Sequence, residues 1–272
     1  MKTSLKKVTA FLLVSVLGVA ALSGCNEKKQ ATNSSAPETK TIVMGTNAAF
    51  PPFEFTTSQG LVGQFDGVDV AISKKIAESM GCELKIEDME FEGLVASVAS
   101  GKVDFAAAGM TVNEERKEQV DFSDPYYVAA QTMVVAADNT TIKSAADLQN
   151  VNKVGVVLGY TGDTVVTETL QVPESKINRV SRGIDAVQNV KNGRLDAVVI
   201  DSVTGKALAE KNGLKTVDDP EAFESEEYAI AVAKGNSELL EKINSVLKEM
   251  KESGEIDKLV QKYNEEGAGS AE

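Results

Sequence analysis

Histidine is absent from the sequence, and its 272 residues include two cysteines. A zinc site of histidine and cysteine ligands, or a Ser-His or Cys-His catalytic arrangement, therefore cannot be assembled. A disulfide is not expected either, because Cys25 follows a leader-like segment and Cys82 begins an apolar alternation typical of a packing residue. Oxygen ligands could bind a hard cation, but no EF-hand loop pattern is present. We expect no metal, no cofactor and no catalytic residues.

Basic residues are also few, 28 against 41 acidic ones, which gives a formal net charge of −13. Such a charge argues against nucleic-acid binding and against peripheral binding to anionic lipid. It is compatible with a small anionic or zwitterionic ligand, because a few local donors can outweigh the net charge.

An apolar run from Val8 to Leu22 follows three lysines near the N-terminus. The run is too short for a membrane-spanning helix and predicts a secretory signal over residues 1–24. Its end, Leu22-Ser23-Gly24-Cys25, resembles the lipobox of bacterial lipoproteins, which implies a lipid on Cys25. The alternative is an ordinary signal with a chance cysteine. Residues 25–40 contain little that could enter a core, which predicts a flexible tether.

From Lys40 onward, short β-rich stretches alternate with amphipathic stretches of helical period. This alternation predicts an α/β fold with parallel sheets and right-handed crossovers. The length fits one large domain or two of about half that size. The predicted strands include TIVMGTN, CELKIEDM, DFAAAGM, TMVVAA, KVGVVLG and LDAVVID, and the predicted helices include DVAISKKIAESMG and FEGLVASVASG.

Two stretches resemble each other, VASVASGKVDFAAAGMT and AVQNVKNGRLDAVVIDS. Each reads as a helix, a glycine, a basic residue, an apolar residue, an aspartate and a strand. A common helix-to-strand turn would explain this, and so would two related lobes. Ligands of open α/β sheets bind beyond the carboxyl ends of strands. The strand ends at Gly109, at Thr161 and at Asp201 are therefore candidate parts of a site.

Thr111 and Asn113 are both suited to cap a helix that carries Arg116 in its first turn. An arginine there opposes the helix dipole unless an anion compensates it. A glutamate of the same helix could pair with it on a solvated face. Alternatively, an external carboxylate or phosphate could bind there. With Asp201 available for a cation, the strand ends together favour a dipolar ligand such as an α-amino acid.

Several stretches, in order, resemble motifs of the family 3 extracellular solute-binding proteins, which deliver polar amino acids to ABC transporters. The resemblance runs from about Thr41 to Tyr263. It is carried by GTNAAFPPFEF, GVDVAISKKIAESMG, SGKVDFAAAGMTVNEERKEQVDFSDPYY, VGVVLGYTGDT, GRLDAVVIDS and EYAIAVAKGNSELLEKINSVLKEMKESGEIDKLVQKY.

The resemblance implies a two-lobed periplasmic-binding-protein fold of the α/β class. Each lobe would be a mainly parallel sheet flanked by helices. Lobe 1 is expected over residues 40–126 and 229–272, and lobe 2 over residues 127–228. Two hinge strands near residues 126–130 and 226–229 would join the lobes, which close over the ligand.

The same resemblance implies roles for five polar positions. Arg116 matches the arginine that binds the ligand α-carboxylate with both arms of its guanidinium. Thr161 matches a residue that donates an N–H to that carboxylate, and Thr111 one that gives backbone and hydroxyl contacts. Asp201 matches the acid that binds the α-ammonium, and Gly109 a residue whose carbonyl accepts from it.

Three further positions match residues near the ligand side chain. Phe50 lies in the proline-fixed loop AAFPPFEF, where its ring can face a ligand instead of continuing a strand. Phe91 fits a ligand contact and a core residue equally well. Asn47 stands where some relatives carry aspartate.

The implied function is extracytoplasmic capture of a free, polar L-amino acid by a monomer anchored to a bacterial membrane through its lipid. The partners would be the permease subunits of an ABC importer, and no nucleic acid is expected. The alternative is an enzyme on the same scaffold, such as an amino-acid-related dehydratase. It would need an acid–base pair, for which Glu54 and Asp201 are the available carboxylates.

Overall fold

The computed structural model describes residues 40–265. These belong to the second of the two units into which the chain divides, Met1–Glu38 and Thr39–Glu272. The predicted signal, the predicted lipidation site Cys25 and nearly all of the predicted tether lie outside the described residues. Between residues 40 and 265, no helix has the length and apolar character needed to cross a membrane.

Strands and helices alternate along the described chain, as the sequence predicts. The strands are β1 (Lys40–Thr46), β2 (Ala49–Phe50), β3 (Glu54–Thr56), β4 (Phe65–Asp66), β5 (Cys82–Asp88), β6 (Phe105–Ala106), β7 (Val120–Phe122), β8 (Tyr127–Ala129), β9 (Gln131–Val135), β10 (Val154–Val157), β11 (Ile177–Val180), β12 (Ala197–Asp201), β13 (Lys215–Val217), β14 (Glu226–Tyr228) and β15 (Ala231–Ala233). The α-helices are α1 (Val68–Ser79), α2 (Leu94–Ala99), α3 (Glu114–Gln119), α4 (Thr161–Thr164), α5 (Gly183–Lys191), α6 (Ser202–Asn212), α7 (Ser237–Glu252) and α8 (Glu255–Glu265). Short 3-10 helices are η1 (Phe91–Gly93), η2 (Ala145–Gln149) and η4 (Glu174–Lys176), and η3 (Val165–Thr169) is a π-helix that continues α4.

One five-stranded sheet, sheet 1, has the order β5-β1-β6-β15-β7. β1 pairs in parallel with β5 and β6, and β15 pairs antiparallel with β6 and β7. Four strands therefore run in one direction and β15 runs in the other. Helix α1 packs on β5 and on α7, and α2 packs on β1, β6 and β15.

A second five-stranded sheet, sheet 2, has the order β11-β10-β12-β9-β13. β10 pairs in parallel with β11 and β12, and β9 pairs antiparallel with β12 and β13. Every residue of β9, β10 and β12 is buried. The sequence of these strands is accordingly a nearly continuous apolar run, as in sheets covered on both faces.

The two stretches that resemble each other in sequence occupy equivalent places in the two sheets. β6 lies between the parallel strand β1 and the reversed strand β15, and β12 lies between β10 and the reversed strand β9. The local similarity thus reflects two lobes with one topology. We refer to the parts built on sheet 1 and sheet 2 as lobe 1 and lobe 2.

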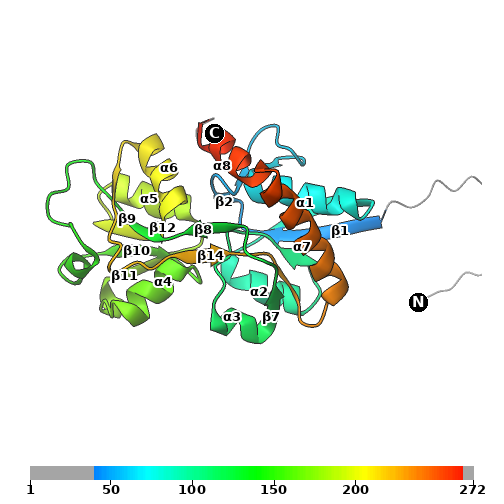
Figure 1. Ribbon diagram of the computed structural model, residues 1–272. Helices are drawn as coiled ribbons and strands as arrows, with labels where there is room; N and C mark the ends of the chain where they lie inside the picture. The colour runs from blue at the N-terminus through cyan, green and yellow to red at the C-terminus, as the bar shows by residue number, and fades with distance from the viewer. Residues whose placement is uncertain (1–39, 266–272) are drawn as a thin grey trace, which may run out of the picture. The chain divides into compact units, whose positions relative to one another are not determined.

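Two antiparallel strands connect the lobes. The chain leaves sheet 1 after β7, passes through β8 into β9 of sheet 2, and returns through β14 to β15. β8 and β14 run side by side, with Tyr127 opposite Tyr228 and Ala129 opposite Glu226 (Figure 1). Both lie within the ranges predicted for hinge strands.

Amphipathic helices cover the sheets through their apolar faces. In α7 the buried residues recur at helical spacing, and the helix is capped by Asn236, whose side chain accepts from the N–H of Leu239 at 3.3 Å. Cys82, at the start of β5, is half-buried against the same core, in keeping with a packing role.

Candidate ligand-binding site

A narrow cavity, with about 10 Å³ of free space, lies beyond the ends of β6, β10 and β12. This is the edge at which open α/β sheets bind ligands. Seven of the eight residues predicted to bind a ligand line it, and Asn47 does not. The lining residues are Phe50, Phe91, Ala108, Gly109, Thr111, Arg116, Tyr160, Thr161 and Asp201.

Arg116 is a buried cation, although it stands in the first turn of a charged helix. Asn113 caps α3 by accepting from the N–H of Arg116 at 2.8 Å, and Glu114 pairs with Lys117 instead. The Arg116 side chain is 8% exposed and donates to the carbonyls of Thr111 at 2.5 Å and Gly159 at 2.9 Å. It forms no ion pair with any carboxylate of residues 40–265. The solvated-face explanation of this arginine is therefore wrong.

The surroundings of the Arg116 guanidinium favour an anion in the cavity. Its carbon lies 5.1 Å from the centroid of the Phe91 ring. Burial lowers the pKa of Arg116, while the negative charges of Asp201 and Glu226 act in the opposite direction. A buried cation balanced by carbonyls and distant carboxylates is costly, and a bound carboxylate would compensate it.

Thr111 is turned away from the helix that it was a candidate to cap. Its hydroxyl donates to Glu226 Oε2 at 2.6 Å, and the amide of Gln131 donates to Glu226 Oε1 at 2.9 Å. Glu226, in β14, thereby links residues that precede α3 and begin β9. Sequence reasoning did not identify Glu226, because only the folded chain brings it to Thr111, 115 positions away.

Asp201 supplies the negative end of the cavity. It is the last residue of β12, is 3% exposed and accepts from the Tyr228 hydroxyl at 2.6 Å. Burial raises its pKa to about 7, and the negative charge of Glu226 adds to the shift. A cation bound beside Asp201 would favour its ionised form.

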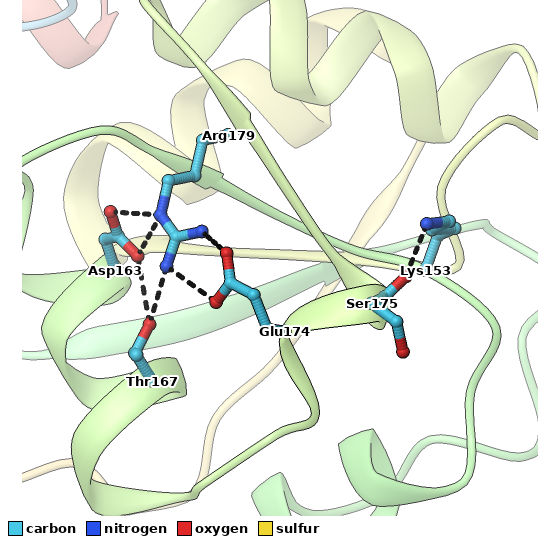
Figure 2. Close-up of polar contacts among 6 residues, drawn as sticks. All are labelled: Lys153, Asp163, Thr167, Glu174, Ser175 and Arg179. Carbon is cyan, nitrogen blue, oxygen red and sulfur yellow. Dashed lines mark hydrogen bonds and ion pairs between the residues drawn. The ribbon is translucent and has the colours of Figure 1, made fainter.

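Thr161 begins α4, which is held by tight packing and by a charged cluster. A Cβ on Gly162 would lie 2.7 Å from the carbonyl of Val199, so glycine allows α4 to approach β12. Figure 2 shows Arg179 reaching Asp163, Thr167 and Glu174 together. Nε of Arg179 lies 2.9 Å from both carboxylate oxygens of Asp163, which fixes the first turn of α4.

Aromatic rings form the remaining wall. The Tyr160 ring packs edge-to-face on Phe50 and Phe91, with centroid separations of 5.4 and 4.6 Å. Its hydroxyl donates to Asn47 Oδ1 at 3.0 Å, and Asn47 Nδ2 donates to the carbonyl of Met89 at 2.7 Å. Asn47 thus lies behind Tyr160. Sequence reasoning selected Thr161 and missed Tyr160, whose aromatic partners are distant in the chain.

Residues 42–266 match the family model of the bacterial extracellular solute-binding proteins, family 3. The chain belongs to this family. A probable histidine-binding protein of Neisseria gonorrhoeae is 33% identical over 269 residues, 98% of each chain. The arginine-binding extracellular protein ArtP of Bacillus subtilis (strain 168) is 34% identical over 258 residues, 93% of this chain and 96% of ArtP. A crystal structure of the substrate-binding protein of an amino acid ABC transporter has a TM-score of 0.75 and 40% identity, over 82% of this chain and 98% of that one.

The lobes of this solute-binding protein contact each other around the cavity. The guanidinium of Arg116 reaches the carbonyl of Gly159, and the Tyr160 hydroxyl reaches Asn47. Arg182 forms an ion pair with Asp88 at 2.7 Å. These contacts describe a closed arrangement of the two lobes.

Behind the cavity, lobe 1 of the solute-binding protein buries two carboxyl groups side by side. Asp69 Oδ2 accepts from the N–H of Gly109 and from the Tyr126 hydroxyl, both at 2.8 Å. Burial raises the pKa of Asp69 to about 6, although these hydrogen bonds oppose the shift. Burial, and then the charge of Asp69, raise the pKa of Glu54 well above its ordinary value. A proton held by Glu54 would relieve the repulsion between the two buried carboxyl groups, and Asp69 itself holds Gly109 through its N–H.

Proposed function

We propose that this protein binds a free L-amino acid between its lobes and delivers it to the permease subunits of an ABC importer. The observation that carries the proposal is the buried guanidinium of Arg116, which faces a cavity without a carboxylate partner among the described residues. Burying an unpaired charge costs several kcal/mol unless a ligand compensates it. Family membership and the amino-acid-binding proteins among its relatives support the same ligand class.

The opposite charges of the cavity give the ligand an orientation. In the proposal Arg116 and the N–H of Thr161 bind the α-carboxylate, and Asp201 binds the α-ammonium together with the carbonyl of Gly109. Thr111 adds contacts from its backbone and hydroxyl. Phe50 and Phe91 contact the side chain. The support for these roles is that all seven residues line one small cavity.

Binding is proposed to proceed by hinge closure. Lobe 1 would comprise residues 40–126 and 229–272, lobe 2 residues 127–228, and β8 and β14 would bend. Lobe-to-lobe contacts such as Arg182 with Asp88 stabilise closure. A ligand that touches Arg116 and Asp201 would add contacts available in the closed state alone, and so shift the equilibrium toward it.

The family is extracellular, and we propose that this member is held to the outer face of a bacterial membrane by a lipid on Cys25. The tether over residues 25–40 would let a monomeric binding unit reach the permease. An intact-mass measurement of protein extracted from membranes tests the lipid, because Cys25→Ser would abolish both the added mass and the membrane association.

An enzyme on this scaffold is less well supported. Glu54, which could have paired with Asp201, is fully buried beside Asp69 and does not line the cavity. Among the residues that line it, Asp201 is the single carboxylate. General acid–base chemistry needs a second group within reach of the substrate. The relatives compared above are described as binding proteins.

Thermal unfolding with a panel of amino acids tests the proposal. The purified protein is unfolded and refolded to remove carried-over ligand, and the midpoint is measured with each common amino acid at millimolar concentration. A ligand that binds the folded state raises the midpoint with the logarithm of its concentration. The N-acetyl derivative and the decarboxylated amine of the best ligand should have no effect, because each lacks one charge.

Two methionine variants give the matched comparison. Arg116→Met should abolish the ligand-dependent shift, whereas Arg194→Met, which removes an exposed arginine of lobe 2, should retain it. An unchanged shift in Arg116→Met, or equal binding of the N-acetyl derivative, would contradict the proposal.

A further inference from the structure

Glu226 lies in the hinge strand β14 and receives a hydrogen bond from each lobe. From lobe 1 the Thr111 hydroxyl donates to Glu226 Oε2 at 2.6 Å, and from lobe 2 the Gln131 amide donates to Oε1 at 2.9 Å. Both donor residues are buried, Thr111 with 7% and Gln131 with 2% of its surface exposed. Glu226 itself does not line the cavity, whereas Thr111 does. Any influence of Glu226 on the geometry of a bound ligand is therefore exerted through its neighbours.

The hydrogen of the Thr111 hydroxyl is directed at the Glu226 carboxylate and away from the cavity. A threonine hydroxyl has one hydrogen and two lone pairs, while an ionised carboxylate accepts hydrogen bonds and cannot donate them. Both Glu226 oxygens receive a donor, which is the arrangement of an ionised carboxylate. The Thr111 oxygen is therefore left with lone pairs alone to offer to the cavity that it lines. Glu226 thereby makes Thr111 a hydrogen-bond acceptor toward a ligand.

Two other residues that line the cavity also present acceptors. Asp201 accepts from the Tyr228 hydroxyl at 2.6 Å, so this hydroxyl too has its hydrogen on a carboxylate. The N–H of Gly109 donates to Asp69 at 2.8 Å, and the Gly109 carbonyl is the group that the proposed function assigns to the α-ammonium. Thr111 Oγ1, Asp201 and this carbonyl then supply three acceptors. An ammonium group has three donors and no acceptor, and so matches them in number and in kind.

We propose that Glu226 is a positioning residue of the binding site, which orients the Thr111 hydroxyl so that its oxygen accepts from the ligand ammonium. This inference rests on the proposed function. Without Glu226, the Thr111 hydroxyl can turn its hydrogen toward the ammonium, and one of the three acceptors is lost. The loss of one hydrogen bond to a charged group weakens binding by about tenfold to a hundredfold.

The same arrangement predicts which ligand analogue the site rejects. An α-hydroxy acid keeps the carboxylate and the side chain of the amino acid, but its hydroxyl supplies one donor where the ammonium supplies three. Two of the three acceptors would then face the analogue without a donor, which is unfavourable in a buried site. We expect the α-hydroxy acid to bind at least about a hundredfold more weakly than the amino acid.

Calorimetric titration of the refolded protein tests the inference. The common L-amino acids are the probes, and the tightest binder is compared with the α-hydroxy acid that has the same side chain, such as L-lactate for L-alanine. Glu226→Ala should weaken the amino acid by about tenfold to a hundredfold. It should also narrow the advantage over the hydroxy acid, because the freed Thr111 hydroxyl can donate to a hydroxyl group. Glu227→Ala, which removes the same charge from an exposed position of the same strand, should match the unmodified protein.

A double-mutant cycle separates positioning from structural support. Thr111→Val keeps the shape of the side chain and removes its hydroxyl. In this background Glu226→Ala should weaken the amino acid by less than about threefold, since no hydroxyl remains to be oriented. A loss of the same size in both backgrounds means that Glu226 acts through its charge or through the hinge, and the inference is then wrong.

The outcomes also separate the inference from the proposed function. If the unmodified protein binds none of the common amino acids, the proposed function fails and the inference fails with it. If it binds an amino acid and the matching α-hydroxy acid equally well, the inference is wrong, while a carboxylate site at Arg116 stands. Because this comparison uses the unmodified protein, it holds even where Glu226→Ala does not fold.

Discussion

Replacing Glu54 by glutamine should change how the stability of this protein depends on pH. Glu54 is fully buried in β3, and neither of its oxygens has a donor among the described residues. Asp69 Oδ1 likewise has no partner, while Asp69 Oδ2 accepts from Gly109 and Tyr126. A proton held by Glu54 and directed at Asp69 would give Asp69 Oδ1 a donor, whereas two adjacent buried carboxylates would repel each other.

The size of the expected change in stability follows from the proton that Glu54 retains in the folded protein. Burial raises the pKa of Glu54 well above 4.5, so the unfolded chain releases this proton at a lower pH than the folded protein does. The stabilisation that this proton provides is complete at a pH below the ordinary pKa of Glu54. It declines as the pH rises toward the pKa that Glu54 has in the folded protein. Each retained proton changes the free energy of unfolding by about 1.4 kcal/mol per pH unit between the ordinary pKa and the folded one.

Glu54→Gln removes this titration, because an amide donates to Asp69 at every pH. The free energy of unfolding of the variant minus that of the unmodified protein should therefore increase above pH 5 by about 1.4 kcal/mol per pH unit, for as long as the folded unmodified protein keeps this proton. Urea unfolding at pH 5, 6, 7 and 8 measures it. The sequence contains no histidine, but Asp69 and Asp201, with pKa values raised to about 6 and about 7, also titrate in this window. The contribution of Asp201 is common to both proteins and cancels in the difference. Glu241→Gln, at an exposed position of α7, is the control and should run parallel to the unmodified protein. If Glu54→Gln also runs parallel, Glu54 is ionised in the folded state and the reasoning is refuted.

Three further predictions concern the cavity. Arg116→Met should raise the free energy of unfolding of the ligand-free protein by about 1–2 kcal/mol in urea, since a buried unpaired cation is removed; a loss of stability would contradict this. Amino-acid affinity should fall up to about tenfold per pH unit below about 7, where Asp201 gains a proton, and Asp201→Asn should flatten the calorimetric profile. Gly162→Ala should destabilise the protein by about 1–3 kcal/mol in the same urea assay, because its Cβ would lie 2.7 Å from the Val199 carbonyl.

Local patterns predict much of this fold. KVGVVLG and LDAVVID become β10 and β12, and DVAISKKIAESMG becomes α1, because burial and helical period leave a direct imprint on the residues involved. Strand direction leaves no such imprint. TMVVAA forms β9, which runs antiparallel to β12, because the chain enters sheet 2 from β8 after crossing between the lobes.

The binding site, like the fold, is predictable from local sequence patterns in part. A helix start near Arg116 was predictable from its caps, but the choice of Asn113 over Thr111 depends on Glu226, which takes the Thr111 hydroxyl. Tyr160 carries no signal in its own segment, since its partner Asn47 lies 113 positions earlier. Sequence therefore predicts which strand ends face the cavity, while side chains from remote segments decide its size.

The two crossings between the lobes also explain how ligand charge and hinge closure are coupled. Tyr126, just before β8, donates to Asp69, which holds Gly109; Tyr228, at the end of β14, donates to Asp201. The N–H of Tyr126 donates to the carbonyl of Tyr228 at 2.9 Å, so these two tyrosines are joined at the hinge. On the proposed function, an ammonium group placed between Gly109 and Asp201 would interact with two groups whose positions are set by the hinge. Bending at β8 and β14 would move them apart, so ligand affinity and the closed state must stabilise each other.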